Sequence, residues 1–314
     1  MRNYYLDGMM GLIVGDAVGV PYEFSSRGKL AAYPASDMIG YGTYNVPAGT
    51  WSDDSSMALA ALDSLRKGYD PENIMQKFTD WLKNGEYTPF GVVFDVGCTC
   101  SGAIKKYLAN GDINRCGCGG ENDNGNGSLM RILPACIYFY EKEKSDSLSV
   151  NEIIANIHTV SALTHSHLRS KIACGLYYFL VKEMIDGNGV IKERLQSGFD
   201  RGFAFYEADA QNLKDLSYYD RMRNIEKFSR LPDSEIQSSG YVVASFEAAV
   251  WCIANTSDYG SCVLEAVNLG SDTDTVAAIA GGLAGLYYGY EGIPEKWTAK
   301  IAKREWIEEL CRNM

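Results

Sequence analysis

The chain has 314 residues, of which 46% are hydrophobic and 22% charged, and its formal net charge is −11. This composition is typical of a globular protein with a large core, and it excludes a collagen-like, a disordered or a small disulfide-stapled protein. The acidic balance and the lack of a basic run argue against nonspecific nucleic-acid binding. An acidic protein can still bind an anion through helix N-termini, backbone N–H groups or a metal.

Features of secretion and membrane insertion are weak in this sequence. Asp7 and Asp16 interrupt the apolar N-terminal stretch, and no signal-peptide cleavage pattern follows it. The longest apolar run near the C-terminus begins at Val276 and is too short to span a bilayer. Four of the nine cysteines lie among apolar residues, as reduced buried thiols do: Cys136, Cys174, Cys252 and Cys262. We therefore expect a cytoplasmic protein with no membrane partner.

Helical periodicity dominates, and the alternation typical of strands is weak. Apolar residues recur at helical spacing in six segments: 57–65, 153–162, 172–185, 241–254, 262–268 and 276–288. The polar stretch 192–240 predicts shorter surface helices. We therefore expect an all-α fold, with residues 1–314 forming a single compact domain.

Two of these helices have further features. Segment 241–254 is apolar on almost every side and predicts a central buried helix. Segment 276–288 is rich in Gly and Ala, which predicts that a neighbouring helix approaches it closely. A bulky replacement such as Gly282→Leu is therefore expected to destabilise the fold.

A long loop rich in Gly, Asn and Asp covers residues 110–128, and a loop of this length is usually functional or disordered. It leads into the segment Asn124 to Arg131, in which glycines allow close backbone approach to a ligand and N–H groups can hold a phosphate. The spacing matches neither a dinucleotide-binding fingerprint nor a Walker A loop, and a simple turn is the alternative.

Two acidic clusters precede predicted helices, at residues 50–56 and 270–275. Helix capping by Ser, Thr and Asp is the simple alternative for each cluster. Capping needs only one side chain, however, and neighbouring aspartates repel one another unless a cation lies between them. Carboxylate and hydroxyl oxygens suit Mg²⁺, Mn²⁺ or Ca²⁺ rather than zinc. Together, the clusters favour a metal site.

A glutamate flanked by proline and aromatic residues follows the N-terminal stretch. Glu23 lies in the run from Gly15 to Phe24, where desolvation can raise a carboxyl pKa and produce an acid or base. The alternative is a surface glutamate on a turn.

In combination and in this order, these motifs resemble the ADP-ribosylglycohydrolase family, over most of the chain from GLIVGDAVGVPYEF to SDTDTVAAIAGGLAGLYYG. The resemblance implies an all-helical fold with a cleft that holds two divalent cations, Mg²⁺ or Mn²⁺. The implied metal ligands are Ser52, Asp53, Asp54, Asp272, Asp274 and Thr275. Ser52 stands where the family usually has Thr, and it keeps the hydroxyl.

Further motifs match the family segments that are implied to form the ligand cleft. Gly125, Asn126, Gly127, Ser128 and Met130 match the family's G-N-G-x-x-M-R segment, which lines the ADP-ribose cleft. His165 resembles the family's T-H segment near the ligand phosphates, although a core or capping histidine is the alternative.

The segment from Phe94 to Gly97 resembles the family's F-D-I-G segment. It places Asp95 as a second catalytic candidate beside Glu23, and Gly97 in the cleft. Cys98 stands where the family often has Asn, so no side-chain contact is carried over to that position.

The implied activity is metal-dependent hydrolysis of the N- or O-glycosidic bond between ADP-ribose and an acceptor side chain, with arginine favoured and Glu23 as the acid–base. The expected partner is ADP-ribose or an ADP-ribosylated protein; nucleic acid enters only as an ADP-ribosylated substrate. The alternatives are a non-catalytic binding or structural protein on this scaffold, and a hydrolase of free or nucleic-acid-linked ADP-ribose.

The pairs Cys98/Cys100 and Cys116/Cys118 have C-x-C spacing, which is unusual for zinc, and free thiols are expected.

Overall fold

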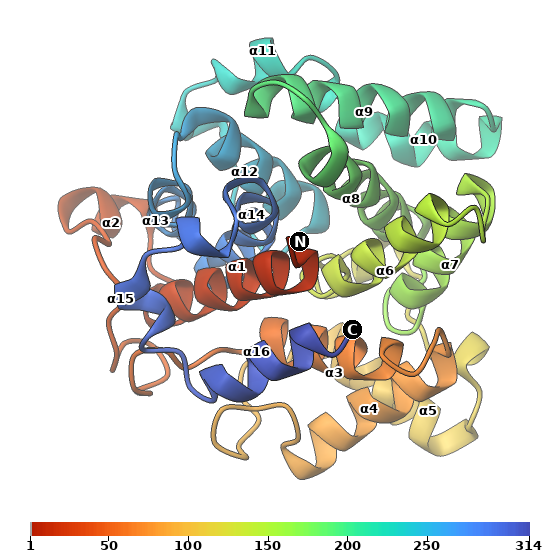
Figure 1. Cartoon of the computed structure of the whole chain (residues 1–314), viewed down its shortest axis with the longest axis horizontal. Coiled ribbons are helices and arrows are strands. Elements are labelled where there is room, and N and C mark those ends of the chain that lie inside the picture. Colours follow the sequence, from red (N-terminus) through yellow and green to blue (C-terminus); the bar gives the residue numbers. More distant parts are fainter. Residues whose placement is uncertain (1) are drawn as a thin grey trace.

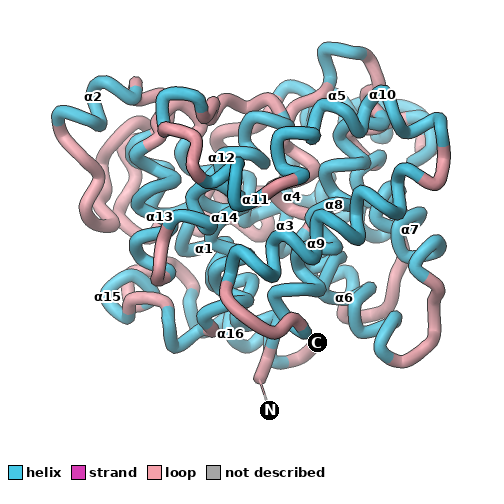
Figure 2. Tube along the Cα trace, turned by 90° about the horizontal axis from the view of Figure 1, so that it is seen from above, coloured by secondary structure: helices cyan, strands magenta, loops and turns pink. Residues whose placement is uncertain are grey.

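The computed structural model describes residues 2–314 as a bundle of sixteen α-helices, arranged as shown in Figure 1 and, from above, in Figure 2. The α-helices are α1 (Tyr4–Gly19), α2 (Arg27–Ala32), α3 (Asp53–Leu65), α4 (Pro71–Asn84), α5 (Cys98–Asn110), α6 (Leu133–Lys144), α7 (Val150–Ala162), α8 (Leu168–Asp186), α9 (Ile191–Glu207), α10 (Leu213–Leu216), α11 (Ile225–Ser229), α12 (Val242–Asn255), α13 (Tyr259–Asn268), α14 (Thr273–Tyr288), α15 (Glu295–Thr298) and α16 (Arg304–Arg312). Seven short 3₁₀ turns connect them: Val20–Tyr22, Ile113–Arg115, Glu121–Asp123, Ala210–Asn212, Ser217–Arg223, Asp233–Glu235 and Tyr290–Gly292. The predicted all-α class is confirmed, since residues 2–314 contain only two isolated β-bridges.

The centre of the fold is the pair α1 and α14, which lie side by side in Figure 1. Glycines on both helices allow the backbones to touch. A Cβ atom at Gly11 would collide with the carbonyl oxygen of Gly281, and one at Gly15 with that of Ala277. The close approach predicted for segment 276–288 is thus confirmed, and it sets the distance between the N-terminus of α14 and the C-terminus of α1.

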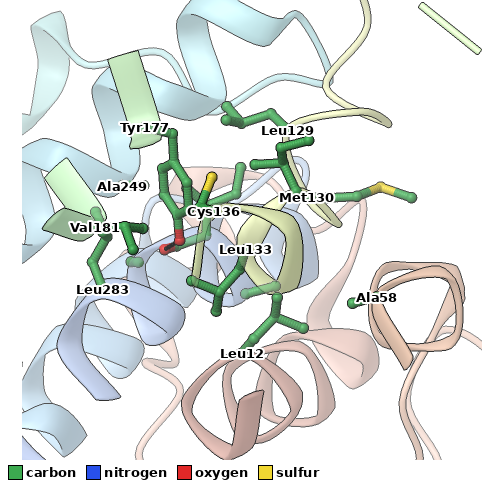
Figure 3. Packing of buried hydrophobic residues seen from close by; sticks show 14 of the residues in the cluster. Leu12, Ala58, Leu129, Met130, Leu133, Cys136, Tyr177, Val181, Ala249 and Leu283 are labelled. Atoms are coloured by element: carbon green, nitrogen blue, oxygen red, sulfur yellow. Dashed lines mark hydrogen bonds between the residues drawn. The ribbon is translucent and has the colours of Figure 1, made fainter. Parts of the chain in front are cut away.

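Other helices cover this pair and complete the core. Helices α12 and α13 pack against α14, while α3, α6 and α16 pack against α1. Figure 3 shows the apolar side chains where α1, α3, α6, α8 and α14 meet, among them Leu12, Ala58 and Leu133. The hydroxyl of Tyr177 on α8 donates to the carbonyl oxygen of Ile279 on α14 at 3.1 Å, so this buried polar group is satisfied.

All six predicted helices are present. Five begin three or four residues earlier than predicted, and α12 begins one residue later. The prediction for residues 192–240 is wrong in part. Helix α9 is long and packs on α8, because Leu195, Phe199 and Phe203 form one buried face. Only the segment after α9 consists of short helices. No helix within residues 2–314 is long and apolar enough to cross a membrane.

Candidate active site

The N-termini of α3 and α14 meet in the interior. Ser52 caps α3 by accepting a hydrogen bond from the Asp54 N–H at 3.3 Å, and Asp53 and Asp54 form the first turn. Asp272 is the N-cap residue of α14. The Thr275 hydroxyl donates to Asp54 Oδ1 at 3.2 Å. The two acidic clusters of the sequence therefore form one group of side chains.

Asp16 on α1 holds the start of α3 in place, and the sequence analysis gave it no role. Its carboxylate accepts hydrogen bonds from the backbone N–H of Ser52, at 3.0 Å, and of Ser55, at 3.1 Å. The Ser55 hydroxyl also donates to it. The sequence feature that could have identified Asp16 is its place in an apolar helical stretch, because a carboxyl group that becomes buried needs hydrogen-bonding partners.

The burial and mutual repulsion of the clustered carboxylates favour a bound cation. Asp54 and Asp274 are fully buried, and Asp274 Oδ2 has no hydrogen-bond partner. Oxygens of Asp16, Asp54 and Asp274 lie within 4.8 Å of one another, as do oxygens of Glu23, Asp272 and Asp274. Burial, reinforced by mutual repulsion, raises the pKa of Asp54 and Asp274 well above the usual value. Divalent cations would remove that repulsion and give the unpartnered oxygen a ligand.

A cavity of about 250 Å³ opens above this acidic group. Eleven of the fifteen residues named from the sequence line it: Glu23, Asp53, Asp95, Gly97, Gly125, Asn126, Gly127, Met130, His165, Asp272 and Thr275. They come from elements far apart in the chain, so the fold collects the motifs at one place. Asn126 connects the loop to the acidic end, since its side-chain N–H donates to Asp272 Oδ2 at 2.7 Å.

The remaining four named residues lie outside the cavity lining. Asp54 and Asp274 lie beneath it, within the buried acidic group, and Ser52 lies at the cap of α3. Ser128 faces the core, where its oxygen accepts from the Ser161 hydroxyl at 3.0 Å. Its hydroxyl therefore supports the loop from inside the fold.

Glu23 and Asp95 lie close together in the cavity lining, and Tyr44 lies near both. Burial raises the pKa of Glu23 to about 8, and the neighbouring Asp95 adds to the effect. Burial and the nearby Glu23 and Asp95 carboxyl groups raise the pKa of Tyr44 above its usual value. Its ring packs on Phe94 with centroids 4.9 Å apart. Tyr44 was not identified from the sequence, because nothing in its local pattern marks it.

The backbone at Asp95 and beside Glu23 is strained. Asp95 adopts a left-handed conformation with φ of 53°, and Phe24, directly after Glu23, has φ of 60°. The Phe24 N–H donates to the Ser271 carbonyl at 2.7 Å, which connects the Glu23 segment to the start of α14. Such conformations cost energy and persist where surrounding contacts fix them, often at functional sites.

His165 also lines the cavity. It is 2% exposed, and its Nδ1 lies 2.8 Å from the Thr164 hydroxyl. Burial, with the nearby Arg131 guanidinium, lowers the pKa of His165 to about 3. The ring is therefore neutral at physiological pH.

The cavity continues into a second depression of about 430 Å³, which shares Gly125 and Gly240 with it and ends beside Tyr241. An elongated ligand fits this arrangement better than a compact one.

The cavity lining includes two cysteines: Cys98, exposed at the start of α5, and the buried Cys100. All nine cysteines are free thiols.

The fold and this site define a class: helical proteins in which two acidic helix starts converge beneath an elongated cleft, as expected of a hydrolase that uses metal ions. The family model for ADP-ribosylglycohydrolase matches residues 1–314. The chain is 31% identical to "ADP-ribosylarginine hydrolase Tri1" of Serratia proteamaculans, over 98% of this chain and 77% of that protein. It is 30% identical to "ADP-ribosyl-[dinitrogen reductase] glycohydrolase" of Rhodospirillum rubrum, over 94% and 89% respectively.

A solved structure described as an "ADP-ribosylglycohydrolase-related protein complex" superposes with a TM-score of 0.78 at 28% identity, covering 99% of this chain and 96% of that one. The chain belongs to the ADP-ribosylglycohydrolase family. It is an enzyme of the hydrolase class, and the family resemblance inferred from the motifs is confirmed.

Proposed function

We propose that the protein removes ADP-ribose from an arginine side chain by hydrolysing the bond at the anomeric carbon. The observation that carries this proposal is the convergence of Asp54, Asp272, Asp274 and Thr275 beneath a cleft that also contains Glu23. Arginine is favoured because the relatives from Serratia proteamaculans and Pseudomonas putida are named ADP-ribosylarginine hydrolases.

We propose two divalent cations, Mg²⁺ or Mn²⁺, as cofactors, held by Ser52, Asp53, Asp54, Asp272, Asp274 and Thr275. Four carboxylates balance the charge of two such ions. When bound, the ions would fix ligand oxygens and lower the pKa of a coordinated water. They would also cancel the negative charge of the cluster, which allows an acidic protein to accept a diphosphate.

Glu23 is the proposed acid–base. Positive charge develops at the anomeric carbon as the glycosidic bond breaks, and the attacking water must lose a proton. Burial raises the pKa of Glu23 to about 8 in the metal-free protein, and bound cations would lower this pKa, so that the ionised carboxylate can accept the proton of that water. Asp95 lies near Glu23 and is the second candidate, and Tyr44 lies near both carboxyl groups.

The rest of the cleft binds the ligand in this proposal. Gly97, Gly125, Asn126, Gly127, Met130 and His165 line the part between the acidic group and the second depression. Ser128 holds this loop from the core side. We place the nucleoside end of the ligand beside the ring of Tyr241, since an aromatic ring offers an apolar face to a base.

The test compares ADP-ribosyl-arginine, ADP-ribosyl-serine, ADP-ribosylated DNA and free ADP-ribose as substrates, each with Mg²⁺, with Mn²⁺ and with excess chelator. The proposal predicts release of ADP-ribose from the arginine conjugate only when metal is present. Binding of ADP-ribose without turnover of any substrate would support the non-catalytic alternative. Turnover in excess chelator would exclude the proposed role of the metal.

A further inference from the structure

Arg131 is a buried cation behind the ligand loop, and the proposed function gives it no role. It is 1% exposed, and its guanidinium lies 4.7 Å from the centre of the Phe78 ring. It donates to the carbonyl oxygens of Gly127 and Val160 and, at 3.0 Å, to the Thr164 hydroxyl oxygen. Arginine has no acceptor atoms, so the Thr164 oxygen is the acceptor in this contact.

The Thr164 hydroxyl accepts from Arg131, and its own hydrogen can therefore be donated to His165. The Thr164 hydroxyl has a single hydrogen, and Nδ1 of His165 lies 2.8 Å from its oxygen. The thiol of Cys100 also lies near this hydroxyl, and its sulfur is a weak acceptor. A hydroxyl that accepts from a cation becomes a better donor, and an imidazole nitrogen is the stronger acceptor. The hydroxyl hydrogen therefore points to Nδ1.

The other ring nitrogen faces the cavity. A Cβ atom added at Gly127 would meet Cε1 of His165 at 2.9 Å, and one added at Gly125 would meet Nε2 at 3.4 Å. The Cε1–Nε2 edge of the ring thus lies against the two glycines that line the cavity. Larger residues at either position would cover this edge.

We propose that Thr164, oriented by Arg131, is a positioning residue that holds His165 in the tautomer with its proton on Nε2, so that the ring donates a hydrogen bond to a ligand oxygen in the cavity. A neutral imidazole carries its single proton on one nitrogen, and the partner of the other nitrogen decides which. The identity of the ligand as ADP-ribose rests on the proposed function; the tautomer does not.

The tautomer is measured directly in the intact, ligand-free protein by two-dimensional ¹H–¹⁵N spectra of protein with ¹⁵N-labelled histidine. The chain has three histidines, so single His→Gln substitutions assign the signals. We expect Nδ1 of His165 to resonate as an unprotonated nitrogen and Nε2 as a protonated one. A proton on Nδ1 in the wild-type protein would overturn the proposal without any variant.

Two substitutions then test whether Thr164 fixes the tautomer of His165. Thr164→Val removes the hydroxyl at nearly constant shape, while Thr164→Ser keeps it. We expect Thr164→Val to lose the fixed tautomer and to bind ADP-ribose roughly three- to tenfold more weakly, as for one lost hydrogen bond. KM should rise with little change in kcat, because this contact binds substrate and transition state alike. Thr164→Ser should restore both the tautomer and the affinity.

The matched control is Thr159→Val on α7, which removes a hydroxyl that donates to the Ala155 carbonyl within the same helix. It should change neither the His165 signals nor the ADP-ribose affinity. An unchanged tautomer and affinity in folded Thr164→Val would overturn the proposal. If wild-type protein fails to bind ADP-ribose, the proposed function fails, and the spectra still decide the tautomer.

Discussion

The hydroxyl of Thr275 donates a hydrogen bond of 3.2 Å to Asp54, although 221 positions separate the two residues. Thr275 lies in the first turn of α14 and Asp54 in the first turn of α3. Helix N-termini carry partial positive charge, which tolerates nearby carboxylates but is too small to neutralise several of them. The convergence of both helix starts therefore creates a concentration of buried negative charge that two cations would balance.

We expect Asp274→Asn to abolish metal-dependent turnover and leave the helical fold intact. The substitution removes a buried carboxyl group that repels its neighbours when ionised and whose Oδ2 has no partner, so the metal-free variant should melt at a higher temperature than metal-free wild-type protein. Turnover assays and circular-dichroism melting in chelator measure both effects. Asp70→Asn is the control, since Asp70 caps α4 at the surface and Asn caps equally well.

Glu23→Gln should lower kcat by about a hundredfold or more and change ADP-ribose affinity little, because the amide keeps the shape but cannot exchange a proton. Single-turnover kinetics and calorimetric titration with ADP-ribose separate the two quantities. A large loss of affinity with normal turnover would move Glu23 from proton transfer to binding.

The close packing of α1 and α14 should be sensitive to a single methyl group. Gly15→Ala places a Cβ atom against the Ala277 backbone and should destabilise the protein by about 1–3 kcal/mol or more. Gly102→Ala lies within α5 with open space around it and should stabilise by about 0.5–1 kcal/mol. Denaturant unfolding of both variants provides the comparison, and equal stabilities would contradict the packing argument.

Stability and metal should be coupled through pH. Burial raises the pKa of Glu23 to about 8 and that of Asp16 to about 6, both above their unfolded values. The folded metal-free protein therefore binds more protons than the unfolded chain, so its stability increases as pH falls from 8 to 7. Saturating Mn²⁺ should weaken this trend by holding the carboxyl groups ionised. Melting temperatures at pH 8 and pH 7, with chelator and with Mn²⁺, test the sign of this pH dependence. A metal-free protein that melts at a lower temperature at pH 7 than at pH 8 would contradict the prediction.

Local sequence patterns predict those helices that have one apolar face or a fully apolar centre, such as 153–162 and 241–254. Helix α1 was not predicted, because it is buried on nearly all sides and includes glycines and two aspartates. Helix α4 was also left out, although Asp70, Pro71 and Gly85 mark its start and end.

The site could be predicted as a set of motifs but not as a geometry. The acidic clusters each resemble ordinary caps, and only the packing of α1 on α14 and α3 brings them together. Tyr44 and Arg131 contact residues distant in the chain, and local sequence patterns do not encode such contacts. Thr164 contacts its chain neighbour His165, and only the fold brings Arg131 to its hydroxyl. Ser128 matches a family motif, and yet its side chain points into the core.

The most direct test of the central claim is electron paramagnetic resonance of the protein titrated with Mn²⁺, combined with metal analysis. If the N-termini of α3 and α14 form one shared metal site, we expect two Mn²⁺ per chain with the spectrum of a magnetically coupled pair. We also expect that pair to be lost in both Asp54→Asn and Asp274→Asn. A single uncoupled Mn²⁺, or a coupled pair that survives both substitutions, would contradict the shared site.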